Sequence, residues 1–297
     1  MRFLTAGESP GPALVAIIEG FPAKVPVAPE AIDRELARRQ LGFGRGGRMK
    51  IERDQVEILS GVRSGETIGS PICLRISNRD WPRWSGVMAP FAPPEAATVN
   101  VAADPLLDQV STVVTTPRPG HADLSGAFKY GYTDLRNIIE RASARETAAR
   151  VGVGAFAKLL LAEFGIFIGS YVTNLGGVGE DYREPLTPAE QDRVDQSPVR
   201  TVNPRLEQAM MAVIEAAREN KETLGGIFVV YATGVPPGLG SHVHWDRRID
   251  GQLAQAVMGI PGIKGVEIGA GFKGAELIGS RMHDPIGYTA ETGWQRA

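Results

Sequence analysis

Residues 134–164 read DLRNIIERASARETAARVGVGAFAKLLLAEF, and this stretch dominates the fold that the sequence predicts. Apolar residues recur along it near helical spacing, as at Ile138, Val153 and Phe156. Its middle is rich in alanine and glycine, whose small side chains allow another helix to approach closely. We therefore expect one central helix from about Asp134 to Phe164, packed inside the protein.

The segments on either side of this helix indicate a mixture of strands and helices. Residues 13–18 form an apolar run typical of a buried strand, and Pro29 is suited to begin a helix that carries Ile32 and Leu36 on one face. Alternating apolar and polar residues at 49–77 predict a strand meander. We also expect a long loop at 82–107, strands at 166–173, 226–233 and 264–268, and a helix at 204–222. Because strands and helices do not alternate regularly, their order favours an α+β fold over a doubly wound sheet, with residues 1–297 in a single domain.

The composition is that of an ordinary globular protein. The chain has 297 residues, of which 43% are hydrophobic and 22% charged, and its formal net charge is -2. These values disfavour a disordered chain and a globally basic nucleic-acid binder. The single cysteine, Cys73, excludes an internal disulfide and fits a reducing, cytoplasmic location. No apolar segment approaches the ~20 residues that span a bilayer, so we expect no membrane partner.

A basic, glycine-rich loop is the first candidate site. The segment between Glu35 and Glu52 holds no acidic residue, but it holds four glycines and five cations: Arg38, Arg39, Arg45, Arg48 and Lys50. Glycines let backbone N–H groups approach a ligand, and arginine binds carboxylate or phosphate through two parallel hydrogen bonds. The loop therefore predicts an anion site. A solvated basic turn is the plain alternative, and an RNA contact is a third reading, disfavoured because Phe43 is the loop's one aromatic residue.

Three further segments carry polar side chains that suit catalysis or binding. Residues 116–123, TPRPGHAD, present His121 between Arg118 and Asp123, where it can act as an acid or base or can simply cap a turn. Within the predicted helix, Arg141 and Arg145 are four residues apart and need an anion or a carboxylate, such as Glu140 or Glu146, between them. On a strand, His242, His244 and Asp246 would share a face; we favour a polar packing loop or subunit contact there and predict no metal.

Taken together, these segments resemble the chorismate synthase family. The matching stretches are RFLTAGES, ELARRQLGFGRGGRMKIE, SGVRSGETIGSPI, RPGHADLSGAFKYGYTDLRNIIERASARETAAR, PPGLGSHVHWD and IPGIKGVEIGAGF. They occur in the family's order and cover nearly the whole chain.

The resemblance implies a fold and a reaction. The fold would place helices between antiparallel β-sheets, in a homotetramer. The reaction would be the anti-1,4-elimination of phosphate from 5-enolpyruvylshikimate 3-phosphate, which gives chorismate. It would require reduced FMN without net redox change, and NADPH would serve as an indirect reductant.

The resemblance also implies roles for individual residues. His121 would keep the reduced flavin correctly protonated. The substrate's phosphate and carboxylates would meet Arg39, Arg45, Arg48, Arg118 and Arg145. Arg39 and Arg45 are also positions linked to NADPH. The flavin would lie along Arg141, Ala142, Ser143, Pro261 and Gly262.

Two departures from the family pattern lead to further expectations. The family motif GESHG, whose histidine is the proposed proton donor to the departing phosphate, here reads GESPG, with Pro10 at that position. Family sequences also continue beyond the equivalent of Ala297, so we expect the single domain to lack that C-terminal region, with weak FMN binding and open strand edges. A catalytically impaired flavin-binding or anion-binding relative, or an assembly partner of an intact enzyme, is the alternative function.

Overall fold

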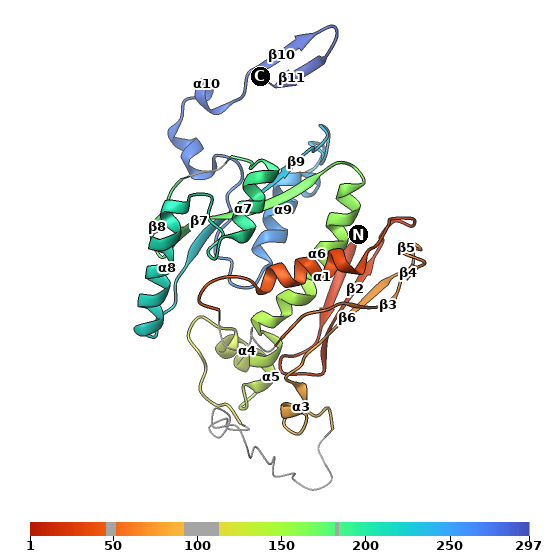
Figure 1. Ribbon diagram of the computed structural model, residues 1–297, viewed down its shortest axis with the longest axis vertical. Helices are drawn as coiled ribbons and strands as arrows, with labels where there is room; N and C mark the ends of the chain where they lie inside the picture. The colour runs from red at the N-terminus through yellow and green to blue at the C-terminus, as the bar shows by residue number, and fades with distance from the viewer. Residues whose placement is uncertain (46–51, 92–112, 182–183, 297) are drawn as a thin grey trace. The chain divides into compact units, whose positions relative to one another are not determined.

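The computed structural model describes residues 1–45, 52–91, 113–181 and 184–296. The chain divides into two compact units, Met1–Val235 and Pro236–Ala297 (Figure 1). In the described parts of the chain, no helix is long and apolar enough to cross a membrane. The single domain expected for residues 1–297 stays a prediction.

The first unit contains two main antiparallel sheets. The order of strands is β1-β2-β6-β3 in one sheet and β8-β7-β9 in the other, and β4 and β5 form a separate hairpin. The strands are β1 (Arg2–Ala6), β2 (Ala13–Glu19), β3 (Glu57–Ser60), β4 (Val62–Arg63), β5 (Glu66–Thr67), β6 (Ile72–Ser77), β7 (Phe167–Leu175), β8 (Val178–Gly179) and β9 (Gly226–Thr233). The helices are α1 (Pro29–Gln40), α3 (Trp81–Trp84), α4 (Asp123–Tyr130), α5 (Arg136–Arg141), α6 (Thr147–Ala162), α7 (Pro188–Gln196) and α8 (Pro204–Glu219).

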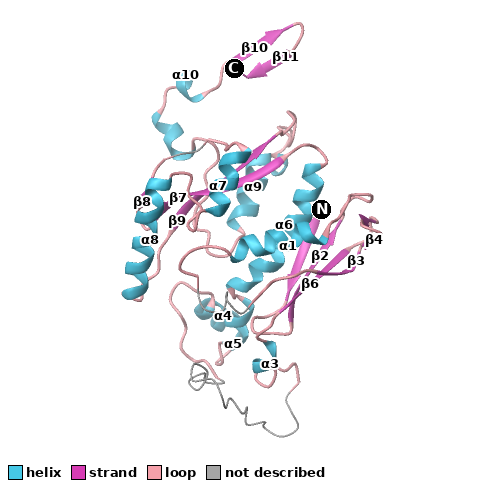
Figure 2. Ribbon diagram, in the orientation of Figure 1, coloured by secondary structure: helices cyan, strands magenta, loops and turns pink. Residues whose placement is uncertain are grey.

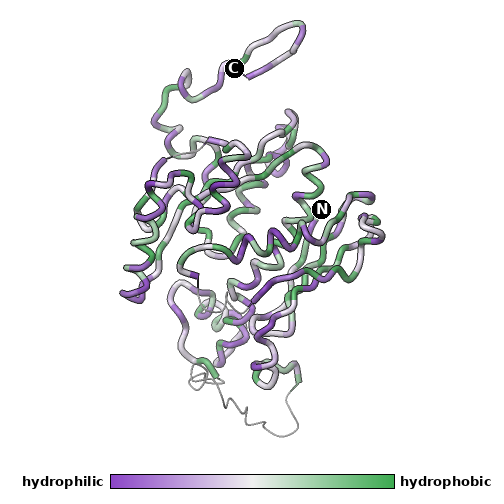
Figure 3. The backbone as a smooth tube through the Cα atoms, in the orientation of Figure 1, coloured by the Kyte–Doolittle hydropathy of each residue, from purple (hydrophilic) through white to green (hydrophobic). Residues whose placement is uncertain are grey.

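The main core forms where α6 covers the first sheet. Alternation along β6 buries Ile72, Leu74 and Ile76 on one face, and β2 adds further apolar side chains to the same layer, which is largely green in Figure 3. Small residues of α6 pack on this face, and a Cβ added to Gly152 would lie 3.5 Å from a side-chain carbon of Leu74. The small side chains therefore allow close helix packing, here against a sheet.

Helices α1 and α6 lie between the two sheets of this unit (Figure 2). Helix α6 contacts β2 and β6 on one side and β7 on the other, and α1 packs against α6. The prediction of an α+β fold with helices between antiparallel sheets is confirmed.

The prediction of one continuous central helix is wrong. Helix α5 ends at Arg141, Ser143 is extended at φ -59° and ψ 139°, and a 3₁₀ turn at Ala144–Glu146 leads into α6. The Ser143 hydroxyl accepts a hydrogen bond from the Arg145 backbone N–H, and serine favours such local bonds over the helix interior. Arg141 and Arg145 therefore do not share one helix face.

The other predicted elements have mixed outcomes. The strands at 13–18, 166–173 and 226–233 and the helices at Pro29 and 204–222 are confirmed within a few residues. The meander predicted at 49–77 is confirmed from Glu57 to Ser77; residues 52–56 are irregular, and 49–51 lie outside the described residues. The predicted loop begins with the short α3 and then enters 92–112, also outside the described residues. The strand predicted at 264–268 is wrong: that segment is irregular and pairs with no strand among the described residues.

The second unit has little core of its own. Its elements are a 3₁₀ turn at Trp245–Arg247, α9 (Ile249–Met258), a 3₁₀ helix at Gly271–Glu276, α10 (Gly279–Met282), β10 (Ile286–Thr289) and β11 (Gly293–Arg296). Among residues 236–296, only Gly274 is buried. Large apolar side chains such as Trp245, Phe272 and Trp294 are more than three-quarters exposed. This unit therefore presents apolar surface that its own residues do not cover.

Candidate active site

A buried carboxylate joins arginines from two distant segments. Asp54 lies just after the basic loop, and both of its oxygens accept from Nη1 of Arg145, at 2.5 and 2.6 Å. Nη1 of Arg39, in the last turn of α1, is 3.6 Å from Oδ2 of Asp54. Glu52 lies 3.5 Å from Nη2 of Arg145. The two cations and two carboxylates form a compact cluster, here called the Asp54 cluster.

The backbone at the start of the basic loop adopts conformations that favour glycine. After α1 ends at Gln40, Gly42 and Gly44 have φ of 125° and 73°, a region that disfavours side chains. A Cβ on Gly44 would lie 2.5 Å from Ile214, so the loop also packs closely on α8. Arg45 is exposed at this turn, where its Nε donates to the Leu41 carbonyl at 3.0 Å. The loop therefore presents Arg45 at the surface, whereas Arg48 lies outside the described residues.

Arg38 and Arg39 are adjacent in sequence but contact different partners. Arg38 donates to Asp195 and Ser170, on the side of α1 that faces the second sheet. Arg39 donates to Thr147 and to the Ala144 carbonyl, beside the Asp54 cluster. Only Arg39 of this pair therefore belongs to the candidate site.

The electrostatics of Arg39 reflect its burial. Burial is the largest effect and lowers its pKa, Asp54 opposes that effect, and the positive charges of Arg145 and Arg45 lower the pKa further. A cation held in this way is ready to bind an anionic partner, because a negative charge would relieve both effects.

Buried polar atoms that lack a hydrogen-bond partner concentrate at the Asp54 cluster. Among the described residues, four buried side-chain atoms have no hydrogen-bond partner: Ser9 Oγ, Arg39 Nη1, Glu52 Oε1 and Arg145 Nη2. Three of them belong to the cluster itself. Buried polar groups are nearly always paired, so this place is suited to a polar ligand or ordered water.

The loop that contains Pro10 is tied to the same cluster. Asn78 donates to the carbonyls of Glu8 and Gly11, at 3.3 and 2.9 Å, and its own oxygen accepts from Nε of Arg145 at 3.0 Å. Pro10 is buried within this loop. The Asn78 side chain therefore links the loop that carries the motif's histidine position to the buried Arg145.

His121 is held by a buried carboxylate at the start of α4. Its Nδ1 contacts Oδ1 of Asp123, and Nη2 of Arg118 is 3.1 to 3.2 Å from the two ring nitrogens. Arg118 also donates through Nε to Asp123, at 2.9 Å. The Asp123 side chain is fully buried, whereas about a quarter of the His121 side chain is exposed. The buried Asp123 carboxylate thus orients the imidazole, part of which is exposed at the surface.

Asp123 is predicted to make stability fall in acid. Burial alone would raise the pKa of its carboxyl, but hydrogen bonds from Arg118 and His121 outweigh burial and lower it to about 2, from 3.8. Because the folded pKa is the lower one, this stabilisation is present above pH 4 and is lost as pH falls from about 4 to 2. It amounts to at most about 2 kcal/mol, since water near the half-exposed Arg118 screens part of it.

Urea unfolding at pH 6, 4 and 3 tests this prediction. Asp123→Asn is expected to be less stable than the parent chain at pH 6, with the difference shrinking towards pH 3. A difference independent of pH would contradict the assignment of the effect to the Asp123 charge.

The predicted flavin residues are half-buried at the break between α5 and α6. Arg141 donates to the carbonyl and hydroxyl of Thr5, while Ala142 and Ser143 are partly exposed. Glu140 is paired with Arg136, and Glu146 with Arg150. The counter-charges of Arg145 are therefore Asp54 and Glu52, not Glu140 or Glu146.

The remaining candidates lie in the second unit. Pro261 and Gly262 are exposed in an irregular segment, and Gly262 has φ of 88°. The stretch 242–246 is a loop entering a 3₁₀ turn, so the strand face considered for a metal does not form. No cluster of three metal-binding side chains occurs in the described parts of the chain.

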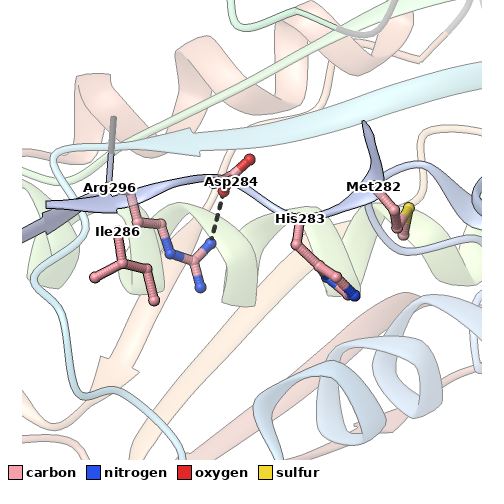
Figure 4. Close-up of a pocket in the computed structure, with 5 residues that line it drawn as sticks. All are labelled: Met282, His283, Asp284, Ile286 and Arg296. Carbon is pink, nitrogen blue, oxygen red and sulfur yellow. Dashed lines mark hydrogen bonds and ion pairs between the residues drawn. The ribbon is translucent and has the colours of Figure 1, made fainter. Parts of the chain in front are cut away.

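A shallow pocket near the C-terminal hairpin also belongs to the second unit. In it, Arg296 reaches Asp284 at 3.1 Å, beside His283 and Ile286 (Figure 4). None of the site residues predicted from the sequence lines this pocket.

Sequence reasoning missed Glu52, Asp54 and Asn78. The available signal was the acidic pair at 52 and 54 directly after a strongly basic segment. Its meaning depends on Arg145, which is 91 residues away from Asp54.

The fold and the site together define an α+β protein with an arginine-rich polar site, the kind that binds small anionic substrates. A family model described as chorismate synthase matches residues 1–295. A chorismate synthase of Symbiobacterium thermophilum is 54% identical over 302 residues, covering 100% of this chain and 74% of that protein. One of Moorella thermoacetica is 55% identical over 294 residues, covering 99% and 73%. This chain belongs to the chorismate synthase family.

A solved structure supports the same relationship. The protein described as "Crystal Structure of Chorismate Synthase" matches with a TM-score of 0.77 and 44% sequence identity. The match covers 99% of this chain and 77% of that one.

Proposed function

We propose that this protein is a lyase of aromatic amino-acid biosynthesis that eliminates phosphate from 5-enolpyruvylshikimate 3-phosphate and so forms chorismate. The reaction breaks a carbon–oxygen bond. The observation that carries the proposal is the Asp54 cluster, where arginines with buried nitrogens that lack a hydrogen-bond partner lie beside a basic glycine loop. A substrate with one phosphate and two carboxylates needs such cations.

The arginines bind and orient this substrate. Arg39, Arg45 and Arg48 contact its anionic groups from the α1 side, and Arg118 and Arg145 add contacts from the other segments. Arg145 is only 4% exposed and already pairs with Asp54, so its proposed contact is the most buried among the described arginines of the set. His121 is proposed to hold a proton for the reaction, and Asp123 fixes its ring.

Reduced FMN is the proposed cofactor, with NADPH as an indirect reductant that involves Arg39 and Arg45. Arg141, Ala142 and Ser143 are half-buried at the break after α5 and thus accessible to a ligand, which supports this assignment. Pro261 and Gly262 are proposed to contribute further contacts. When bound, the reduced flavin would supply electron density and a proton acceptor, and His121 would hold the proton that keeps it correctly protonated.

We further propose a cytoplasmic homotetramer. A single cysteine fits a reducing compartment. The exposed Trp245, Phe272 and Trp294 are surface that copies of the chain would cover.

The proposed function is tested by an anaerobic chorismate-formation assay with chemically reduced FMN, which needs no reductase. Chorismate formation supports the proposal. Binding of FMN or substrate without any turnover, in the parent chain and in the Pro10→His chain discussed below, would favour the catalytically impaired relative instead.

Arg45→Ala is predicted to weaken substrate binding by ~1.5–3 kcal/mol, the contribution of a charge-assisted hydrogen bond. The reason is that Arg45 is exposed on the basic loop. Its Nε donates to the Leu41 carbonyl, which leaves its other N–H groups for an anion. Calorimetry at low salt measures the change. Arg193→Ala is the control, because Arg193 is exposed on α7 outside the site. Equal affinity of the Arg45→Ala and parent chains would make the loop a solvated turn.

A further inference from the structure

Asp54 has no role in the proposed reaction, yet it is a buried carboxylate next to a second one, Glu52. Its side chain is fully buried, and that of Glu52 is 2% exposed. Buried carboxylates are costly unless their partners compensate them. Asp54 therefore owes its place to the arginines that it contacts.

Asp54 lies between two cations that would otherwise repel each other. It accepts two short hydrogen bonds from Arg145 and lies 3.6 Å from Arg39. Both guanidinium groups contact Asp54 and so lie close to each other, and the Arg145 charge lowers the pKa of Arg39. Asp54 supplies the counter-charge that lets both groups remain there.

The two arginines differ in what they can reach. Arg145 is 4% exposed, whereas the Arg39 side chain is 14% exposed. Arg39 is also held by Thr147 and by the Ala144 carbonyl, at 3.0 and 3.1 Å, yet its Nη1 has no hydrogen-bond partner. Arg39 is thus the more accessible of the two cations, and the Asp54–Arg145 pair is buried beside it.

A second carboxylate in the same unit bridges two arginines, but there no buried polar atom of the described side chains lacks a hydrogen-bond partner. Asp195 accepts from Arg38 at 3.1 Å and is 2.8 Å from Arg200. In that group the side chains also bond to Ser170 and Gln191, and none of their buried atoms lacks a partner. The Asp195 group is therefore complete by itself, whereas the Asp54 cluster leaves hydrogen-bonding capacity for a ligand.

We propose that Asp54 is a positioning residue, which holds Arg39 over the buried Arg145 so that Arg39 meets an anionic group of the substrate already oriented. The inference rests on the proposed function. Its physical basis is pre-organisation, because a site whose cations are already placed loses less free energy when the anion binds.

A double-mutant cycle with the full chain tests this role. Substrate affinity is measured by calorimetry for the parent, Asp54→Asn, Arg39→Ala and the double variant. Asp54→Asn is expected to weaken binding about tenfold, because Arg39 loses its orientation, and Arg39→Ala by ten- to a hundredfold. If Asp54 acts through Arg39, the double variant binds like Arg39→Ala alone. Asp54→Glu, which keeps the charge, is expected to restore part of the affinity.

Asp195→Asn is the matched control, since it also removes a carboxylate between two arginines. It is expected to lower the melting temperature and to leave substrate affinity unchanged. Independent losses that add in the Asp54→Asn/Arg39→Ala protein would overturn the positioning role, because Asp54 would then affect binding without acting through Arg39. Unchanged or tighter binding by Asp54→Asn would overturn it too. If the parent chain itself binds no substrate, the proposed function fails, and this inference with it.

Discussion

His121→Ala is expected to lower turnover by ~10²–10⁴-fold, the usual loss when a general acid or base is removed. The geometry supports this size of effect, because a buried carboxylate orients the ring and its edge is exposed. The rate is best measured in the Pro10→His background, with reduced FMN under anaerobic conditions, where activity is expected to be highest.

Two variants separate chemistry from folding in this experiment. Asp123→Asn keeps the imidazole but removes its anchor, so an intermediate loss is expected. His244→Ala removes another histidine that pairs with an aspartate two residues later, His244 with Asp246 at 2.7 Å, and is expected to retain activity. Circular dichroism establishes that all variants are folded. Turnover of His121→Ala equal to its background would remove His121 from the catalytic residues.

Pro10→His is expected to raise turnover, recovering part of a ~10²–10⁴-fold loss that Pro10 imposes on the parent chain. Proline has no side-chain proton to donate and no backbone N–H, so departing phosphate receives help only from arginine charge and water. The Pro10 loop is tied to Arg145 through Asn78, so a histidine there would stand near the cations that hold the substrate.

Pro10→Gln is the control for this prediction, because glutamine offers hydrogen bonds but no titrating proton. Only the histidine variant is expected to gain activity, with a dependence on pH that the glutamine variant lacks. If the parent chain forms chorismate at ~10 s⁻¹, a rate typical of enzymes, the role assigned to that position is wrong.

Local patterns were enough to predict most elements of this fold. The alternation that places Ile72, Leu74 and Ile76 on one face is encoded within β6, and the small residues of α6 are encoded within a few turns. Proline at the first turn likewise set the start of α1. These features depend on neighbours in sequence, which a single chain displays directly.

Elements that depend on distant partners were predicted less well. The segment 264–268 has apolar residues but no neighbouring strand with which to pair, so it stays irregular. The central helix breaks at Ser143, where Arg145 turns to Asp54 and Asn78 instead of continuing the helical face. Helical periodicity alone does not record such long-range hydrogen bonds.

The sequence by itself predicted the polar groups of the candidate site: a concentration of cations without acids and a histidine between an arginine and an aspartate. The resemblance to the family added a proline where a proton donor is usual. Only the tertiary structure decided which charges pair. Arg38 and Arg39 are adjacent, but successive side chains diverge by about 100° around a helix, so one reaches Asp195 and the other the Asp54 cluster. Charge pairing depends on distance through space, and the residue that completes the cluster, Asp54, meets Arg145 only because the sheet and the helices between the sheets bring them together.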